Sequence, residues 1–177
     1  MTFEIAIDRC PYCGGSLTTQ YINDKRRLVC AKCGKTIYLN PVPVVASVVI
    51  KDNSILLAKR KNLPNIGKWN LPAGFLELYE QPEEGALREL KEETGLLGED
   101  PKLCCAITQN SKRYGSVVVL GFIIPKTYGK IVPGDDASDA RFFKLNDIPK
   151  IPFSSHRKII KHAIKDLKLD IKLPFNS

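Results

Sequence analysis

The amino-acid sequence predicts an α/β fold with a mixed sheet covered on both faces, preceded by a small cysteine-bearing module. Three observations support this prediction. Four of the six cysteines lie in the first 40 residues, predicted strands and two helices interleave after residue 40, and 177 residues suffice for one well-buried core with a small appendage. We therefore expect one module over residues 1–40 and a larger one over residues 41–177.

The first module contains two Cys-x-x-Cys pairs, CPYC at 10–13 and CAKC at 30–33, with sixteen residues between them. Two such turns complete a tetrahedron of thiolates, which is a strong zinc signature, whereas two disulfides are the alternative. Forty residues bury too little apolar surface to fold alone, and structural zinc contributes about 10–16 kcal/mol in small peptides. The sequence thus predicts a closed, structural Zn²⁺ site formed by Cys10, Cys13, Cys30 and Cys33.

The second module begins with a predicted hairpin. Residues 42–50 are a nearly continuous β-branched run, residues 51–53 form a turn, and residues 54–59 form the returning strand. Residues 61–73 contain two prolines and a glycine and are predicted to be a loop. Further strands are expected at 103–109, 117–124 and 140–144, with a turn-rich segment at 128–138. Cys104 and Cys105 are adjacent in one strand, so we expect their side chains to point to opposite faces.

Two helices are predicted in this module. The first has Pro82 in its first turn, Glu83 and Glu84 near the positive end of its dipole, and Gly95 at its end. The second is capped by Ser154 or Ser155 and runs to about residue 169. Its predicted apolar stripe consists of Ile159, Ile160, Ala163, Ile164 and Leu167.

The formal charge of +8 is concentrated at the two ends of the chain. Residues 1–40 hold six lysines and arginines against three acids, and residues 144–177 hold eight against three. Such ends could steer a polyanionic substrate or bind RNA, and solvated lysines are the alternative. No apolar run has the length of a membrane span and the first ten residues do not resemble a secretory signal, so we expect a cytoplasmic protein without a membrane partner.

Three glutamates crowd one face of the first predicted helix. Glu89, Glu92 and Glu93 are spaced i, i+3, i+4 and so are neighbours on an α-helix. Like charges at this spacing destabilise an isolated helix. We therefore expect a cation at this face, and a divalent metal ion is the simplest candidate.

The segment 74–96 matches the pattern G-x5-E-x7-R-E-U-x-E-E-x-G-U at all nine specified positions, where U is aliphatic. This pattern is the Nudix box, so the chain resembles a Nudix hydrolase. The cysteine module, residues 38–41, WNLPAGFLE at 69–77 and DARFFKLNDIP at 139–149 resemble the zinc-ribbon branch of that family. The resemblance implies an α/β/α sandwich and hydrolysis of a nucleoside diphosphate linked to another moiety.

The resemblance also implies roles for individual residues. Glu92 and Glu93 would be the principal ligands of Mg²⁺ or Mn²⁺, Glu89 a ligand or the catalytic base, and Gly74 a carbonyl ligand. Glu80 and Arg88 would pair to fix the loop over the helix, and Asp136 is a candidate later ligand or, equally, a plain turn residue. Candidate substrate contacts, for each of which packing or solvation is the alternative, are Lys59, Arg60, Phe75 and Tyr114.

The substrate is less sharply indicated than the reaction. The SQPWPFP-like array of NADH pyrophosphatases is absent, and residues 106–115 read AITQNSKRYG, so ADP-ribose or FAD is favoured over NADH. An enzyme directed to RNA caps or dinucleotides, with the basic ends holding RNA, remains an alternative. A non-catalytic nucleotide-sensing domain is a second one, and a homodimer is possible.

Overall fold

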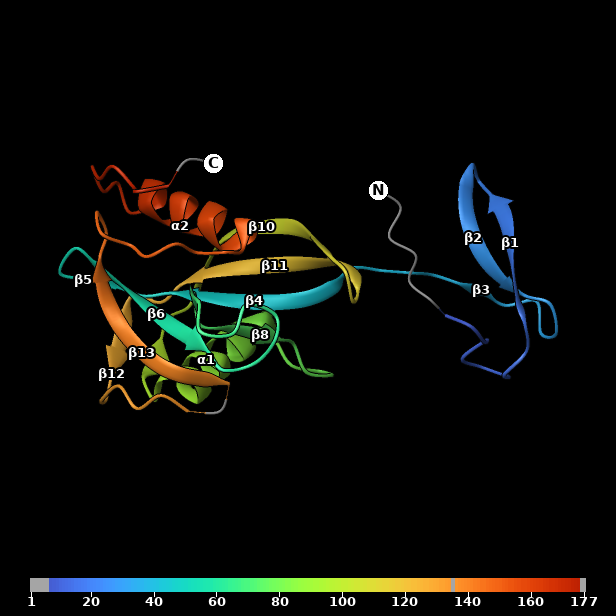
Figure 1. Ribbon diagram of the computed structural model, residues 1–177, viewed down its shortest axis with the longest axis horizontal. Helices are drawn as coiled ribbons and strands as arrows, with labels where there is room; N and C mark the ends of the chain where they lie inside the picture. The colour runs from blue at the N-terminus through green and yellow to red at the C-terminus, as the bar shows by residue number, and fades with distance from the viewer. Residues whose placement is uncertain (1–6, 135, 176–177) are drawn as a thin grey trace. The chain divides into compact units, whose positions relative to one another are not determined.

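The computed structural model describes residues 7–134 and 136–175, and the chain divides into two compact units (Figure 1). The first unit extends to Pro41 and also includes Asn110–Ser116. The second unit comprises Val42–Gln109 and the chain from Val117 onward. Residues 110–116, although distant in sequence, thus belong to the same unit as the cysteine-bearing residues. The predicted division at residue 40 assigned this segment to the larger module.

The first unit is built on an antiparallel sheet in the order β1 (Leu17–Ile22), β2 (Lys25–Cys30) and β3 (Thr36–Ile37). The β1–β2 turn consists of Asn23 and Asp24, both at positive φ, which suits a two-residue hairpin. The buried apolar cluster of this unit is small and consists of Cys10, Cys30 and Ile37. Little apolar surface therefore holds the unit together.

The second unit contains a mixed sheet in the order β10-β11-β4-β8, with β11 (Gly115–Ile123) parallel to β4 (Val42–Val48) and β8 (Ala73–Phe75) antiparallel to it. A second sheet has β6 (Ser54–Arg60) between β13 (Ala137–Lys144) and the two short strands β5 (Ile50–Lys51) and β7 (Trp69–Asn70). A short antiparallel pair joins β9 (Leu97–Glu99) to β12 (Lys126–Tyr128). The remaining strand, β10, is Lys102–Ser111.

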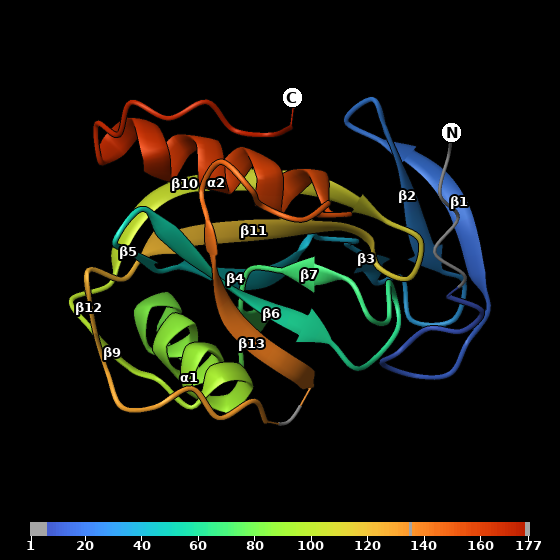
Figure 2. The ribbon, with the colours of Figure 1, turned by 60° about the vertical axis from the view of Figure 1, so that its left-hand side comes forward.

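Helices α1 and α2 lie on opposite faces of the β10-β11-β4-β8 sheet (Figure 2), so the second unit is the expected α/β/α sandwich. Helix α1 spans Pro82–Thr94. Its N-terminus carries a capping box between Gln81 and Glu84, and Gly95 ends it at a φ of 75°. The predicted start and end of this helix are confirmed. Leu90 and Ala86 pack into the buried core, and the Ser47 hydroxyl of β4 donates a hydrogen bond to the Ala86 carbonyl at 2.8 Å.

Helix α2 spans Ser154–Asp166, so the predicted extension to residue 169 is wrong. No side chain caps its N-terminus; instead the Ser155 hydroxyl donates to Gln109 Oε1 at 2.9 Å. The predicted stripe is buried except for Leu167, which lies past the helix end and is exposed. Within the described ranges, no helix is long and apolar enough to cross a membrane.

Three local predictions require correction. The expected loop at 61–73 contains β7 and the start of β8, and β13 begins three residues before the expected strand at 140. Cys104 and Cys105 do not point apart, because their sulfur atoms are 3.7 Å from each other. Both are half-buried, and the alternation of exposed and half-buried residues along β10 begins only after them.

Candidate active site and metal centre

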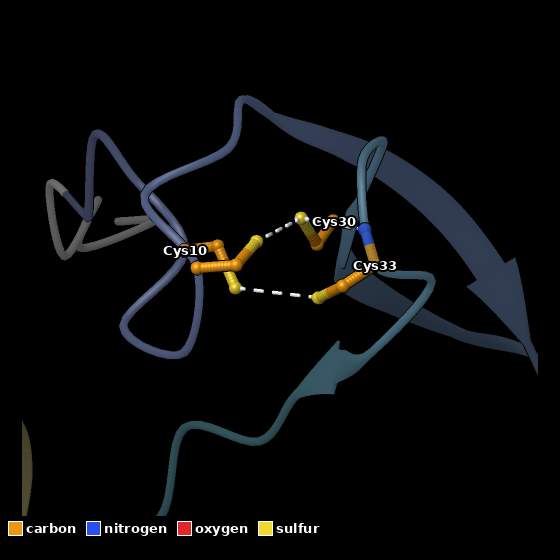
Figure 3. Close-up of side chains that lie close together, drawn as sticks. Cys10, Cys30 and Cys33 are labelled. Atoms are coloured by element: carbon orange, nitrogen blue, oxygen red, sulfur yellow. Dashed lines mark hydrogen bonds between the residues drawn. The ribbon is translucent and has the colours of Figure 1, made fainter.

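The four predicted zinc cysteines lie together. Each Cys-x-x-Cys turn has the same backbone hydrogen bonds, with Gly14 N–H donating to the Cys10 carbonyl and Gly34 N–H to the Cys30 carbonyl, both at 2.9 Å. These turns direct their thiols toward one another (Figure 3). All four sulfur atoms lie within 4.8 Å of one another, with Cys10 Sγ 3.8 Å from Cys33 Sγ and Cys13 Sγ 3.5 Å from Cys30 Sγ.

These distances fit a tetrahedral zinc site. Sulfur atoms that each lie about 2.3 Å from one ion are separated by about 3.8 Å, whereas a disulfide requires about 2.05 Å. The backbone N–H of Cys33 donates to Cys30 Sγ at 3.4 Å and lowers the pKa of the Cys30 thiol to about 6. The charged form that binds metal is therefore favoured at this position. The cluster is compatible with zinc, whereas its occupancy stays a prediction.

The second candidate site lies where β8 meets α1. Glu89 is half-buried, Glu92 is exposed, and Glu93 is buried with 5% of its surface accessible. Glu93 lies on the inner side of the helix, and its Oε2 accepts a hydrogen bond from the Ala73 backbone at 3.2 Å. The helical spacing thus brings the three glutamates to the edge of β8 with different exposure to water.

Arg88 is the cation that pairs with two of these glutamates, Glu89 and Glu92. Its Nη1 contacts Glu89 Oε1 at 2.7 Å and Glu92 Oε2 at 2.9 Å. Its Nε and Nη2 contact the Glu80 carboxylate at 2.6 and 2.9 Å, and Nη2 also donates to the Phe75 carbonyl at 3.0 Å. Hydrogen bonding by Arg88 lowers the pKa of Glu80. Arg88 therefore offsets part of the negative charge of this face and ties the loop after β8 to α1.

Gly74 allows strand β8 to lie close to the Glu89 side chain of helix α1. A Cβ atom placed on Gly74 would overlap the carboxylate of Glu89. The φ of Gly74 is not positive, so the need for glycine is steric and not conformational. Strand β8 and helix α1 consequently bring the Gly74 backbone and the Glu89 carboxylate side by side.

Glu93 is the acid of this site whose pKa is most strongly shifted. Burial, with the nearby charge of Glu89, raises the pKa of Glu93 to about 8. Arg60 and the Ala73 N–H act in the opposite direction, and Asp136 adds to the increase. Asp136 is therefore an electrostatic neighbour of Glu93, and its Oδ1 accepts a hydrogen bond from Asn62 at 2.6 Å. A buried carboxyl with a raised pKa and acidic neighbours is typical of cation and catalytic sites.

The donor set fits a hard divalent cation. Mg²⁺ takes oxygen ligands, keeps several waters and uses only one or two carboxylates, so it needs no closed cage. Among the residues that the structure describes, the cysteine cluster is the one group of three or more potential ligands whose atoms all lie within 4.8 Å. The carboxylates of Glu89 and Glu92 are bridged by Arg88.

The candidate substrate contacts lie in different surroundings. Lys59 Nζ lies 5.9 Å from the ring centre of Trp69, which packs edge-on against Phe143. Arg60 donates through Nε to the Pro64 carbonyl at 2.7 Å. Phe75 follows Gly74 directly and is 43% exposed. Tyr114 belongs to the first unit, whereas α1 belongs to the second.

One buried polar residue near this site was not predicted. His156 of α2 accepts a hydrogen bond through Nδ1 from the Leu71 backbone at 3.2 Å. Burial, with the nearby charge of Arg60, lowers the pKa of His156 to about 3, so it is neutral at physiological pH. His156 lies three positions before Ile159, on the same face of α2 as the apolar stripe. This spacing is the feature of the sequence that could have predicted its burial. His156 thus anchors the segment that leads into β8.

Comparisons with known proteins agree with this architecture. A model of the NUDIX domain family matches residues 41–163. An ADP-ribose pyrophosphatase of Methanocaldococcus jannaschii is 44% identical over 130 residues, which cover 73% of this chain and 76% of that protein. An NAD-capped RNA hydrolase, NudC, of Pseudomonas aeruginosa is 31% identical over 155 residues, covering 86% of this chain but only 54% of that protein. A crystal structure of a NUDIX hydrolase from Nitrosomonas europaea superposes with a TM-score of 0.76 at 27% identity, covering 94% and 96% of the two chains.

Proposed function

Because the chain belongs to the Nudix hydrolase family, we propose that it hydrolyses the pyrophosphate bond of a nucleoside diphosphate derivative, with ADP-ribose or FAD as substrate. The products would be a nucleoside monophosphate and a phosphorylated second moiety. The observation that carries this proposal is the 44% identity to an ADP-ribose pyrophosphatase over most of both chains. The complete set of box glutamates around Gly74 supports a catalytic rather than a purely sensing role.

A divalent cation is part of the proposal. The residues that would hold it are Glu92 and Glu93, with Glu89, Asp136 and the Gly74 carbonyl as further ligands. When bound, Mg²⁺ or Mn²⁺ offsets the negative charge of the diphosphate oxygens and acidifies a water molecule.

The protein's own residues then have separate tasks. The Ala73 N–H orients the Glu93 carboxylate, and burial keeps that carboxylate away from competing water. Glu89, held against Gly74, is a candidate to take the proton from the attacking water, a role that contributes about 10² to 10⁴ in rate. Arg88 fixes the loop between β8 and α1 through Glu80 and the Phe75 carbonyl.

A second candidate function is hydrolysis of an RNA cap. The relative that favours it is the NAD-capped RNA hydrolase, which matches 86% of this chain. The chain spans only about half of that relative's length, so the activity of the whole relative does not transfer directly.

A substrate panel tests the proposal. We would assay ADP-ribose, FAD, NADH, diadenosine polyphosphates and NAD-capped RNA with Mg²⁺ or Mn²⁺, and identify the products by mass. We expect AMP with ribose 5-phosphate from ADP-ribose, or AMP with FMN from FAD. Turnover of NAD-capped RNA far above both would select the second function.

Variants of α1 test the site. Glu92→Gln and Glu93→Gln should each lower kcat/KM by about 10² or more without loss of folding. Glu83→Gln, on an exposed position of the same helix, is the matched control and should stay within about twofold of wild type. Near-normal turnover by either site variant would exclude the assignment.

A further inference from the structure

The first unit displays tyrosine rings beside positive charges. Tyr12 is 65% exposed, and Lys35 Nζ lies 4.2 Å from its ring centre. Tyr38 is 61% exposed, and the Arg27 guanidinium lies 5.1 Å from its ring centre. Tyr21, which is 79% exposed, is the strand partner of Arg26 across the β1–β2 hairpin. Because side chains alternate along a strand, Tyr21 with Arg26 and Arg27 with Tyr38 lie on opposite faces of the hairpin. We call the exposed surface that carries these six residues around the hairpin the tyrosine–cation surface.

The charge of this unit is not compensated within it. Residues 7–41 and 110–116 hold eight lysines and arginines against two aspartates. In the described part of this unit, none of these cations forms a salt bridge. An uncompensated positive field on a small unit attracts polyanions.

Packing within the unit does not account for the exposed rings. The buried cluster consists of Cys10, Cys30 and Ile37, and none of the three tyrosines belongs to it. Cation–π contacts at exposed positions stabilise a protein by only about 0.5–1 kcal/mol each. A ring with a cation on one face and water on the other is, in contrast, suited to stack on a flat ligand.

We propose that the tyrosine–cation surface binds single-stranded nucleic acid, with its tyrosine rings stacked on bases and its lysines and arginines in contact with phosphates. Exposed aromatic rings combined with positive charges are the general means by which proteins hold unpaired strands. A duplex presents its phosphates but not its base faces, so the rings select for unpaired nucleotides. The surface lies outside α1 and β8, and binding does not depend on which diphosphate is cleaved.

The direct test is fluorescence anisotropy with the full-length protein and a 15-nucleotide, 3′-labelled oligo(A) RNA. The RNA carries a 5′-hydroxyl and the buffer contains no added Mg²⁺, so hydrolysis does not interfere. A DNA strand of equal length reports whether the ribose hydroxyl contributes, and a duplex of equal length competes for phosphate contacts alone. We expect both single strands to bind and the duplex to bind at least fivefold more weakly.

Substitutions at the rings test stacking specifically. Tyr12→Leu and Tyr38→Leu keep apolar bulk but remove the π-face, and each should weaken binding about tenfold. Tyr12→Phe and Tyr38→Phe should bind within about twofold of wild type. Tyr128→Leu removes an exposed tyrosine of the second unit and should leave the affinity unchanged. Zinc content and thermal unfolding of each variant verify that the first unit stays folded.

The salt dependence of binding tests the contribution of the lysines and arginines. For single strands, log affinity falls with log salt by about 0.7 per phosphate contact, so Arg27→Gln should reduce the slope by about that amount. Absence of RNA binding by the wild type would overturn the proposal. The proposal would also be overturned if the leucine variants bound RNA like wild type and the duplex bound as tightly as the single strands. The surface would then bind polyanions through charge alone. Hydrolysis of ADP-ribose by the Tyr12 and Tyr38 variants should remain at the wild-type rate.

Discussion

Substitution of Gly74 by alanine tests whether the rate depends on the close approach between β8 and the Glu89 side chain of α1. Non-bonded carbon atoms prefer separations of about 3.5 Å, and the added methyl would overlap the Glu89 carboxylate, which must then withdraw by more than about 1 Å. A misplacement of 1 Å in a catalytic group costs about 10²-fold in rate, or about 2.7 kcal/mol of transition-state stabilisation. We therefore expect kcat/KM of Gly74→Ala to fall about 100-fold.

The stability of this variant should change little. Gly74 has no positive φ, so alanine introduces no backbone strain, and the half-buried Glu89 side chain can rotate toward solvent. We would measure kcat/KM for the best substrate of the panel and the free energy of unfolding in urea. A large loss of stability together with the loss of rate would show that the methyl disturbs the fold and not the carboxylate.

A double-mutant cycle gives the decisive control. With Glu89→Ala there is no carboxylate for the methyl to displace, so adding Gly74→Ala should lower the residual rate by less than about twofold. Full additivity of the two losses would refute the reasoning, because the glycine would then act independently of Glu89.

Three further predictions concern other features. Arg88→Lys cannot reproduce the two-atom contact with Glu80, and we expect urea unfolding to show a loss of about 1–3 kcal/mol. His156 stays neutral in the folded state down to about pH 3, whereas an unfolded histidine binds a proton below about 6.5. Its stabilising contribution is therefore complete above pH 6.5 and is lost as the pH falls toward 3, by up to about 5 kcal/mol, and stability curves of His156→Gln should be flatter over this range. Cys33→Ser should lose its zinc by elemental analysis, whereas Cys104→Ser, outside the cluster, should retain it.

The sequence specified α1 well because its signals are local. Pro82 and Gly95 mark its two ends within 14 residues, and the glutamate spacing alone places three acids on one face. The grouping of the four cysteines was equally predictable, since each turn is formed by its own short motif. The covered sheet followed from the interleaving of predicted strands with two helices, and the α/β/α sandwich from the family resemblance.

The remaining features depend on contacts between distant residues. Strand β9 has three residues and exists because it pairs with β12, almost thirty residues later. His156 reaches Leu71 across 85 positions. The glutamate spacing correctly predicts charge crowding on α1, but a metal ion is not the only way to relieve it. Arg88, already part of the motif, supplies a cation from within the same helix.

The contacts of Arg88 bear on when the protein would need each of the two proposed metals. Arg88 neutralises part of the acidic face of α1, so we expect the second unit to fold before any Mg²⁺ is bound. The first unit has three buried apolar residues in its cluster and four thiols that converge on one point. We therefore expect zinc supply to govern how much intact protein accumulates during synthesis, and magnesium supply to govern only how fast the finished protein works.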